Sequence, residues 1–226
     1  MTKQNKLKQL LQKIVEIPSV SGNEECMSQF ILNYLGKNNH EVKSEIDFKG
    51  NLICQKGNKP FKLAISTHMD KVGFLVSGIK KDYIEVIGIH TLEKFNYGFI
   101  SQVWVIDSKG NKYSGVLSNE SKDDNLLKVY IENKGQFEIG NFVCYKSNFS
   151  ISEDIISSAY LDNSMGVAVA LDLISQVKNG TFIFSALEEM GSQGVGYAVV
   201  KYKPSNIVVL DTTYDIENGK GAKLHL

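Results

Sequence analysis

The sequence predicts an α/β fold, in which a mostly parallel sheet is flanked by helices and an all-β domain is inserted. Two observations lead to this prediction. In the first and last parts of the chain, short apolar runs rich in β-branched and aromatic residues alternate with helical patterns, which is typical of buried parallel strands. The middle part contains short strand-like runs between Gly, Asn and Lys turns, without a convincing helical pattern. We therefore expect an α/β domain made of residues 1–75 and 154–226, with a β domain at residues 76–153.

The first elements along the chain are predicted to be two helices. Near the N-terminus, apolar residues recur at helical spacing, which indicates an amphipathic helix packed on the core rather than a signal peptide. The apolar positions of this helix are Leu7, Leu10, Leu11, Ile14 and Val15. Ser21 and Glu24 then have the spacing of a capping box, which predicts a second helix that ends at about Leu35.

Three predicted strands stop at side chains that bind metals in proteins. Each strand is a short apolar run, at 61–67, 181–187 and 206–210. Because ligands of open α/β sheets bind outside the carboxyl ends of the strands, we expect the side chains at these ends to share one edge of the sheet. The residues at the three ends are His68 and Asp70, Glu188 and Glu189, and Asp211.

The first strand end pairs an imidazole with a carboxylate. His68 and Asp70 are two positions apart in an extended segment, so their side chains point to the same face. The imidazole can then bind a cation while the carboxylate orients it. A single pair of this kind is more often an ordinary hydrogen-bonded pair. The prediction of a metal site depends on the similar residues at the other strand ends.

Asp162 is a fourth contribution, from the start of a predicted helix at about 164–177. Asp and Asn are also preferred helix caps, so Asp162 and Asn163 have an alternative role that involves no metal. Counted together with the three strand ends, Asp162 is expected to be a metal ligand.

The adjacent acids Glu188 and Glu189 suit a division of roles. Two acids in a turn usually face water, but neighbouring side chains also point in different directions. One can therefore bind a metal while the other accepts a proton from a metal-activated water. This arrangement predicts hydrolysis.

Four motifs occur in an order that resembles the glutamyl aminopeptidase and tetrahedral aminopeptidase family, which is metallopeptidase family 42. They are H-M-D-K-V-G-F from His68, L-D-N-S-M-G from Leu161, E-E-M-G from Glu188 and L-D-T-T from Leu210. The segments S-V-S-G-N-E from Ser19, G-N-L from Gly50 and G-K-G-A from Gly219 also resemble that family. The resemblance covers nearly the whole chain.

The resemblance implies roles for the predicted site residues. His68, Asp162 and Asp211 would hold one metal, Asp162 would bridge to a second that Glu189 also binds, Glu188 would be the general base, and Asp70 would support His68. The implied activity is that of a cytoplasmic metalloaminopeptidase that removes N-terminal residues from short peptides. It would use one or two divalent metals per chain, and mixed imidazole and carboxylate ligation suits zinc, cobalt or manganese.

The chain departs from the family pattern in three respects. Asn163 and Ser164 stand where the family usually has Asp and Arg, and the sequence contains no Arg at all. A substrate site built on a bidentate Arg clamp is therefore excluded. Family members also continue beyond the position of Leu226, and their further segment holds a His that completes the second metal site.

The other histidines give little support for a complete second site. His225 aligns with a strand position of the family, and His40 is expected to be solvated, so we expect neither to bind metal. One tightly held metal and weak or absent activity are therefore expected. The alternative to an active enzyme is a catalytically impaired or non-enzymatic relative that retains the fold and one metal site.

Composition limits the classes of partner. The formal net charge is zero, so no basic field attracts nucleic acid, and no apolar run is long enough for a membrane span. Cys26, Cys54 and Cys144 lack C-x-x-C spacing and are expected to be unpaired thiols in a reducing cytoplasm. The resemblance implies that the inserted β domain makes homo-oligomer contacts. His90 in this insert is expected to be a surface residue rather than part of a neighbouring subunit's site.

Overall fold

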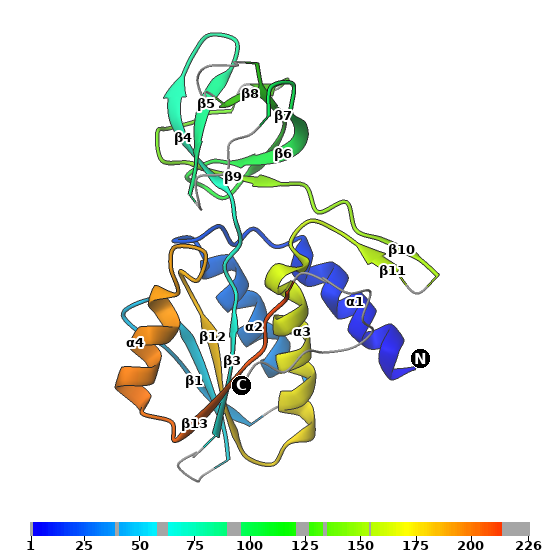
Figure 1. Cartoon of the computed structure of the whole chain (residues 1–226), viewed down its shortest axis with the longest axis vertical. Coiled ribbons are helices and arrows are strands. Elements are labelled where there is room, and N and C mark those ends of the chain that lie inside the picture. Colours follow the sequence, from blue (N-terminus) through cyan, green and yellow to red (C-terminus); the bar gives the residue numbers. More distant parts are fainter. Residues whose placement is uncertain are drawn as a thin grey trace.

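The computed structural model describes residues 2–38, 41–57, 63–89, 96–120, 127–132, 135–153 and 155–213. It consists of an α/β part and a closed β-barrel that stands at one end of it (Figure 1). The chain enters the barrel after the third strand of the α/β part and leaves it before a small hairpin. None of the helices in these ranges is long and apolar enough to cross a membrane.

Among the described residues, four helices cover the sheet of the α/β part from both sides. Their bounds are Lys3–Val15 (α1), Glu25–Lys37 (α2), Leu161–Gln176 (α3) and Gln193–Tyr202 (α4). α1, α2 and α3 pack on one face, where they bury Phe182 and Phe184 of the sheet, and α4 packs on the opposite face over Ile183 (Figure 1). The apolar positions predicted for the first helix from Leu10 onward are its buried positions.

Within the described part of the chain, the sheet has five strands in the order β1-β2-β12-β3-β13. Their bounds are Val42–Ile46 (β1), Leu52–Lys56 (β2), Leu63–His68 (β3), Gly180–Ser185 (β12) and Asn206–Val209 (β13). β3 is parallel to both β12 and β13, whereas β2 is antiparallel to both β1 and β12. The sheet is therefore mixed: β1, β12, β3 and β13 run in one direction, and among these five strands only β2 runs in the opposite direction. β1 and β2 form a hairpin, whose short turn allows only antiparallel pairing.

The barrel contains six strands, all paired antiparallel. Their bounds are Phe74–Ile79 (β4), Ile84–Gly88 (β5), Ile100–Ile106 (β6), Lys112–Asn119 (β7), Leu127–Ile131 (β8) and Phe142–Tyr145 (β9). The first strand β4 pairs with the last strand β9, which closes the barrel and removes free strand edges. A separate hairpin, Ser150–Ser152 (β10) and Ile155–Ser157 (β11), follows.

Two hairpins close with turns of the same pattern, D-x-K-G-N. One turn is at 47–51, between β1 and β2, and the other is at 107–111, between β6 and β7. In each, the Asp carboxylate accepts hydrogen bonds from the amides two and four residues later and from the Asn side chain, at 2.8–3.1 Å. Gly50 and Gly110 adopt the left-handed φ values of +86° and +82° that favour glycine. Local sequence is sufficient to specify both turns.

Candidate metal centre

His68 is the last residue of β3 and is held between two sets of acidic groups. Only 4% of the residue is exposed. Its Nδ1 lies 3.2 Å from the backbone oxygen of Asp70 and 3.5 Å from Asp70 Oδ1. Its Nε2 lies on the other side of the ring, 3.0 Å from Asp162 Oδ1 and 3.6 Å from Asp211 Oδ1. Asp70 therefore orients the ring so that Nε2 faces the remaining carboxylates.

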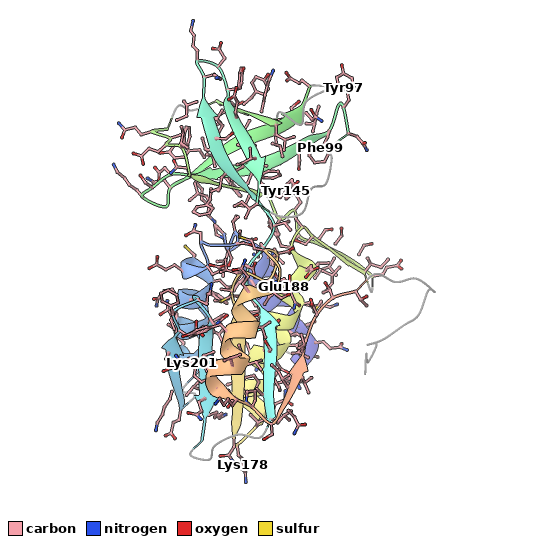
Figure 2. All side chains as sticks on the ribbon, turned by 60° about the vertical axis from the view of Figure 1, so that its left-hand side comes forward. Tyr97, Phe99, Tyr145, Lys178, Glu188 and Lys201 are labelled. Carbon is pink, nitrogen blue, oxygen red and sulfur yellow. The ribbon has the colours of Figure 1, made fainter. Side chains whose placement is uncertain are left out.

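The predicted metal residues from the strand ends and from α3 come together around this ring. Two sets of side chains have ligand atoms that all lie within 4.8 Å of one another. One set is His68, Asp162 and Asp211, and the other is His68, Glu188 and Glu189. Figure 2 places Glu188 at the end of the α/β part that faces the barrel, and Lys178 at the opposite end. The cluster thus lies at the carboxyl ends of the three parallel strands.

Asp162 and its neighbour divide the two roles that the sequence left open. The Asp162 carboxylate reaches His68, whereas the Asn163 side chain accepts a hydrogen bond from the amide of Gly166 (2.9 Å) and donates to the backbone oxygen of Leu210 (2.7 Å). Asn163 therefore supports the first turn of α3 and ties it to the end of β13. Asp162 remains directed to the imidazole.

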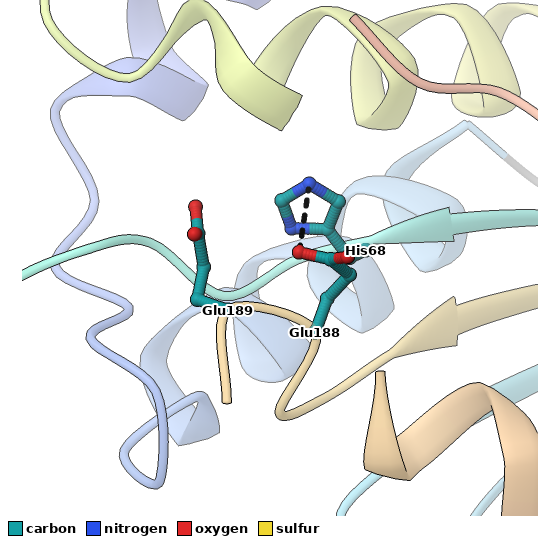
Figure 3. Close-up of side chains that lie close together, drawn as sticks. All are labelled: His68, Glu188 and Glu189. Carbon is teal, nitrogen blue, oxygen red and sulfur yellow. Dashed lines mark ion pairs between the residues drawn. The ribbon is translucent and has the colours of Figure 1, made fainter. Parts of the chain in front are cut away.

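Glu188 and Glu189 point in different directions from one turn. The Glu188 carboxylate approaches the imidazole, with Oε2 4.0 Å from His68 Nε2, while the Glu189 carboxylate stands to one side (Figure 3). The hydroxyl of Ser192 donates to the other oxygen of Glu188, Oε1, at 3.0 Å. One acid is thus held beside the ring and the other is offset from it.

The charges around His68 fit a bound cation. Burial by itself favours the neutral ring, but hydrogen bonds to Asp162 and Asp70 and the surrounding negative charges raise the pKa of His68 to about 10. Burial, together with the nearby carboxylates, raises the pKa of Glu189 to about 7, although His68 opposes this shift. Among the described residues, His68 is the only basic group that forms an ion pair with Asp162, Glu188 or Asp211. A site with such an excess of carboxylates favours a positive charge, and its imidazole and carboxylate donors suit a borderline divalent metal.

Asp70 also makes contacts that the sequence analysis missed. It is fully buried, and its carboxylate accepts hydrogen bonds from the backbone amides of Glu188 (3.0 Å) and Glu189 (3.1 Å) and from the hydroxyl of Ser21 (2.6 Å). The prediction of a capping box at Ser21 and Glu24 is wrong. α2 begins without a side-chain cap, because the Ser21 and Glu24 side chains point to Asp70 and to the amide of Leu187 instead.

Three of the predicted or considered positions lie outside the described residues. They are His40, His90 and His225, and the G-K-G-A segment at 219–222 also lies outside. All three cysteines are described, and all are free: Cys54 and Cys144 are buried and Cys26 is exposed.

Known proteins resemble this chain in sequence. The profile of the M42 glutamyl aminopeptidase family matches residues 50–225. Lysyl aminopeptidase of Pyrococcus furiosus is 29% identical over 94% of this chain and 68% of its own length. The FrvX protein of Escherichia coli is 29% identical over 90% of this chain and 64% of its own length. The chain thus spans about two thirds of the length of these curated relatives.

Solved structures resemble the chain in fold. An aminopeptidase from the archaeon Desulfurococcus kamchatkensis aligns with a TM-score of 0.83 and 21% identity, over 98% of this chain and 67% of that one. The TET1 peptidase of Pyrococcus horikoshii, which can assemble into a tetrahedron or a large octahedral shell, aligns with a TM-score of 0.78 and 22% identity, over 91% of this chain and 68% of that one. The α/β part with its barrel is therefore an arrangement that these peptidases share.

Proposed function

The chain belongs to the M42 glutamyl aminopeptidase family, and from this premise we propose that it is a metal-dependent aminopeptidase acting on short peptides. The observation that supports this proposal most directly is the convergence around His68. An imidazole, two aspartates and two glutamates from four separate segments meet at one edge of the sheet. A structural ion pair would need only one of these carboxylates.

We assign the metal ligands as follows. His68, Asp162 and Asp211, whose ligand atoms lie within 4.8 Å of one another, would hold one divalent cation. Glu189 together with Asp162 would serve a second. Zinc, cobalt and manganese all suit this donor set. When bound, such a cation supplies Lewis acidity, which polarises a peptide carbonyl and acidifies water.

Glu188 is the proposed general base. Its side chain is about one third exposed (32%), so it is open to water and to a substrate while it stays beside His68. The hydrogen bond from Ser192 occupies Oε1, which leaves Oε2 on the side of the imidazole. The carboxylate accepts the proton of the attacking water and passes it to the amine that leaves when the peptide bond breaks.

The alternative function is that of an impaired relative with one metal. This alternative is favoured by the small number of nitrogen ligands, because His68 is the only histidine among the described residues. The proposed second metal then has only the carboxylates of Asp162 and Glu189 as ligands, and we expect this site to bind a borderline metal weakly. We therefore propose one tightly held metal per chain and weak activity.

The first prediction separates the base from the ligands. Glu188→Gln should keep metal binding but lower the rate of aminoacyl-anilide hydrolysis by about 100-fold, since a lost general base costs about that much. Glu189→Gln is the matched control and should weaken metal binding. Titration calorimetry with Zn²⁺ and Mn²⁺, paired with rate measurements, checks both variants.

Several outcomes would contradict these assignments. Full activity of Glu188→Gln, or activity that survives exhaustive chelation, excludes the proposed mechanism. Two equally tight metals per chain exclude the one-metal expectation. One metal without any hydrolysis by the native chain favours the impaired relative.

We also propose that the barrel is the inserted domain expected from the sequence, and that it carries a subunit contact. Large apolar side chains are exposed on its strands, among them Ile79, Ile87, Ile100 and Val116. The protein should therefore be a homo-oligomer in light scattering, and replacement of residues 76–153 by a short linker should reduce its mass to that of a monomer. A monomer in both cases contradicts the proposal. A cytoplasmic location is proposed as well, since the three cysteines are free.

A further inference from the structure

The loop that carries the two glutamates is held in an unusual way. After β12, four consecutive backbone N–H groups, those of residues 186–189, donate to side chains instead of to a neighbouring strand. In chain order, the acceptors are Asn51 Oδ1 (3.0 Å), Glu24 Oε1 (3.3 Å), Asp70 Oδ1 (3.0 Å) and Asp70 Oδ2 (3.1 Å). Each acceptor therefore fixes one or two successive peptide planes of this loop.

The acceptors come from three distant segments and are themselves fixed. Asn51 and Asp70 are fully buried, and Glu24 is 8% exposed. The Asn51 amide group donates to Asp47 Oδ2 (2.8 Å) and to the backbone oxygen of Gly194 (2.9 Å). Glu24 Oε1 accepts a second hydrogen bond, from the amide of Gly22 (2.9 Å). Buried groups with all their partners in place hold a rigid position.

The peptide planes of this loop decide where its side chains point. Leu187 adopts a left-handed φ of +57°, a conformation that is unfavourable for a residue with a branched side chain and that needs support from its surroundings. Its amide is the one that Glu24 accepts. The turn at Leu187 then sends Glu188 toward the imidazole and Glu189 to one side (Figure 3).

We propose that Glu24 and Asn51 are positioning residues of the candidate site, which set the separate directions of Glu188 and Glu189 by holding the amides of residues 186 and 187. Neither residue is among the proposed ligands or the base, so each acts through the loop. This inference rests on the proposed function of the two glutamates. It adds to Asp70, which holds the next two amides.

The second D-x-K-G-N turn shows that these contacts are additional to what the turn itself needs. Asn111 occupies the position of Asn51 in the barrel turn and makes the same bond to its aspartate, Asp107 (2.9 Å). In the part of the chain that the structure describes, the Asn111 side chain has no other hydrogen-bond partner. The bonds from Asn51 to residues 186 and 194 are therefore not required to close a turn of this kind.

Asn51→Ala and Asn111→Ala are the matched pair of variants that tests the inference. Both remove the same bond within a turn, but only Asn51→Ala frees the amide of residue 186. We expect hydrogen exchange at residues 186–189 to become at least about 10-fold faster in Asn51→Ala and to stay unchanged in Asn111→Ala. In Asn51→Ala, kcat should fall by about 10- to 100-fold with little change in KM, because a misplaced base loses rate rather than substrate binding.

A second pair keeps the test decisive if Asn51→Ala does not fold. Glu24→Gln retains an oxygen that can accept from Leu187, whereas Glu24→Ala removes it. We expect Glu24→Ala to accelerate exchange at residues 186–189 and to weaken Mn²⁺ binding measured by calorimetry, and Glu24→Gln to restore both.

The exchange readout does not depend on catalysis. Unchanged exchange and unchanged Mn²⁺ affinity in Asn51→Ala or in Glu24→Ala would overturn the inference, as would equal effects of Asn51→Ala and Asn111→Ala at residues 186–189. A failure of the proposed function alone would give a different result. Glu188→Gln would then be fully active, while hydrogen exchange at residues 186–189 would still depend on Glu24.

Discussion

The turns at 47–51 and 107–111 share one pattern of residues and one set of internal hydrogen bonds, but they lie in different surroundings. The first closes a hairpin of the mixed sheet, next to the loop with the two glutamates, and its Asn51 is fully buried. The second closes a hairpin of the barrel, and its Asn111 is exposed. An asparagine side chain offers an acceptor and two donors. The Asn111 side chain uses one donor, for the bond within its turn. The Asn51 side chain also accepts from the amide of Ala186 in the neighbouring loop and donates to the backbone oxygen of Gly194 in α4.

This difference shows where a structural motif acquires a functional role. The aspartate, glycine and asparagine of the pattern are enough to form the turn in either place. The role in the candidate site comes from the polar atoms of the Asn side chain that make no hydrogen bond within the turn. It also depends on which segments the fold places within hydrogen-bond distance of those atoms. The same five-residue pattern therefore predicts a hairpin in both places and a contact with the site in only one.

The largest expected effect is at Gly194, which accepts a hydrogen bond from Asn51. A methyl group added at Gly194 would collide with the backbone oxygen of Ala186 and with Asn51 Oδ1. Because backbone must move to relieve this clash, Gly194→Ala should lower the free energy of unfolding by about 3 kcal/mol. Denaturant unfolding followed by far-UV circular dichroism measures this, since the helices of the described residues all lie in the α/β part.

Gly196 in the same helix is the matched control. A methyl group there would meet no atom within 4 Å, and alanine is the better helix former. Gly196→Ala should therefore leave stability unchanged or raise it by up to about 1 kcal/mol. Equal behaviour of the two variants would mean that the contact between Asn51, Ala186 and α4 is looser than the structure indicates.

A smaller destabilisation than at Gly194 is expected at the two turn glycines. Gly50 and Gly110 have nearly the same left-handed φ, so alanine at either should destabilise its hairpin by about 1 kcal/mol. A methyl group at Gly50 would lie 3.5 Å from the Ala186 side chain, which is an ordinary contact. Trp104 fluorescence reports on the barrel for Gly110→Ala, and circular dichroism reports on the α/β part for Gly50→Ala. Costs that differ by more than about 1 kcal/mol would show that the two turns are not equivalent even locally.

The sequence predicted the location of the candidate site better than its internal support. His68, Glu188 and Asp211 follow apolar runs directly, so the edge where they meet follows from strand alternation and topology alone. The support from Glu24 to Leu187 links residues far apart in the chain, and no local pattern contains it. The spacing of Ser21 and Glu24 suggested a helix cap, because a sequence pattern shows only the partners that lie nearby in the chain.

The antiparallel orientation of β2 within the sheet was not predicted. The prediction of a mostly parallel sheet did not take account of Asp47, Gly50 and Asn51, although these residues are a recognisable hairpin signal between two strands. The strands that lead to the site are parallel because helices or the barrel connect them. β1 and β2 have only a short turn between them, which brings the chain back antiparallel.

The pairing of β4 with β9 has a consequence for how the sheet is assembled. β3 and β12 are neighbours in the sheet, but the whole barrel lies between them in the chain. Because Phe74 and Val143 are paired, a folded barrel joins its own two ends, and most of the chain that remains between β3 and β12 is the β10–β11 hairpin and α3. The entropy lost in bringing the ends of a loop together grows with the logarithm of its length, so the folded barrel lowers this cost for β3 and β12 by about 1 kcal/mol compared with an unstructured segment of equal length. Folding of the insert therefore makes it easier for β3, which carries His68, to pair with β12, which leads to the two glutamates.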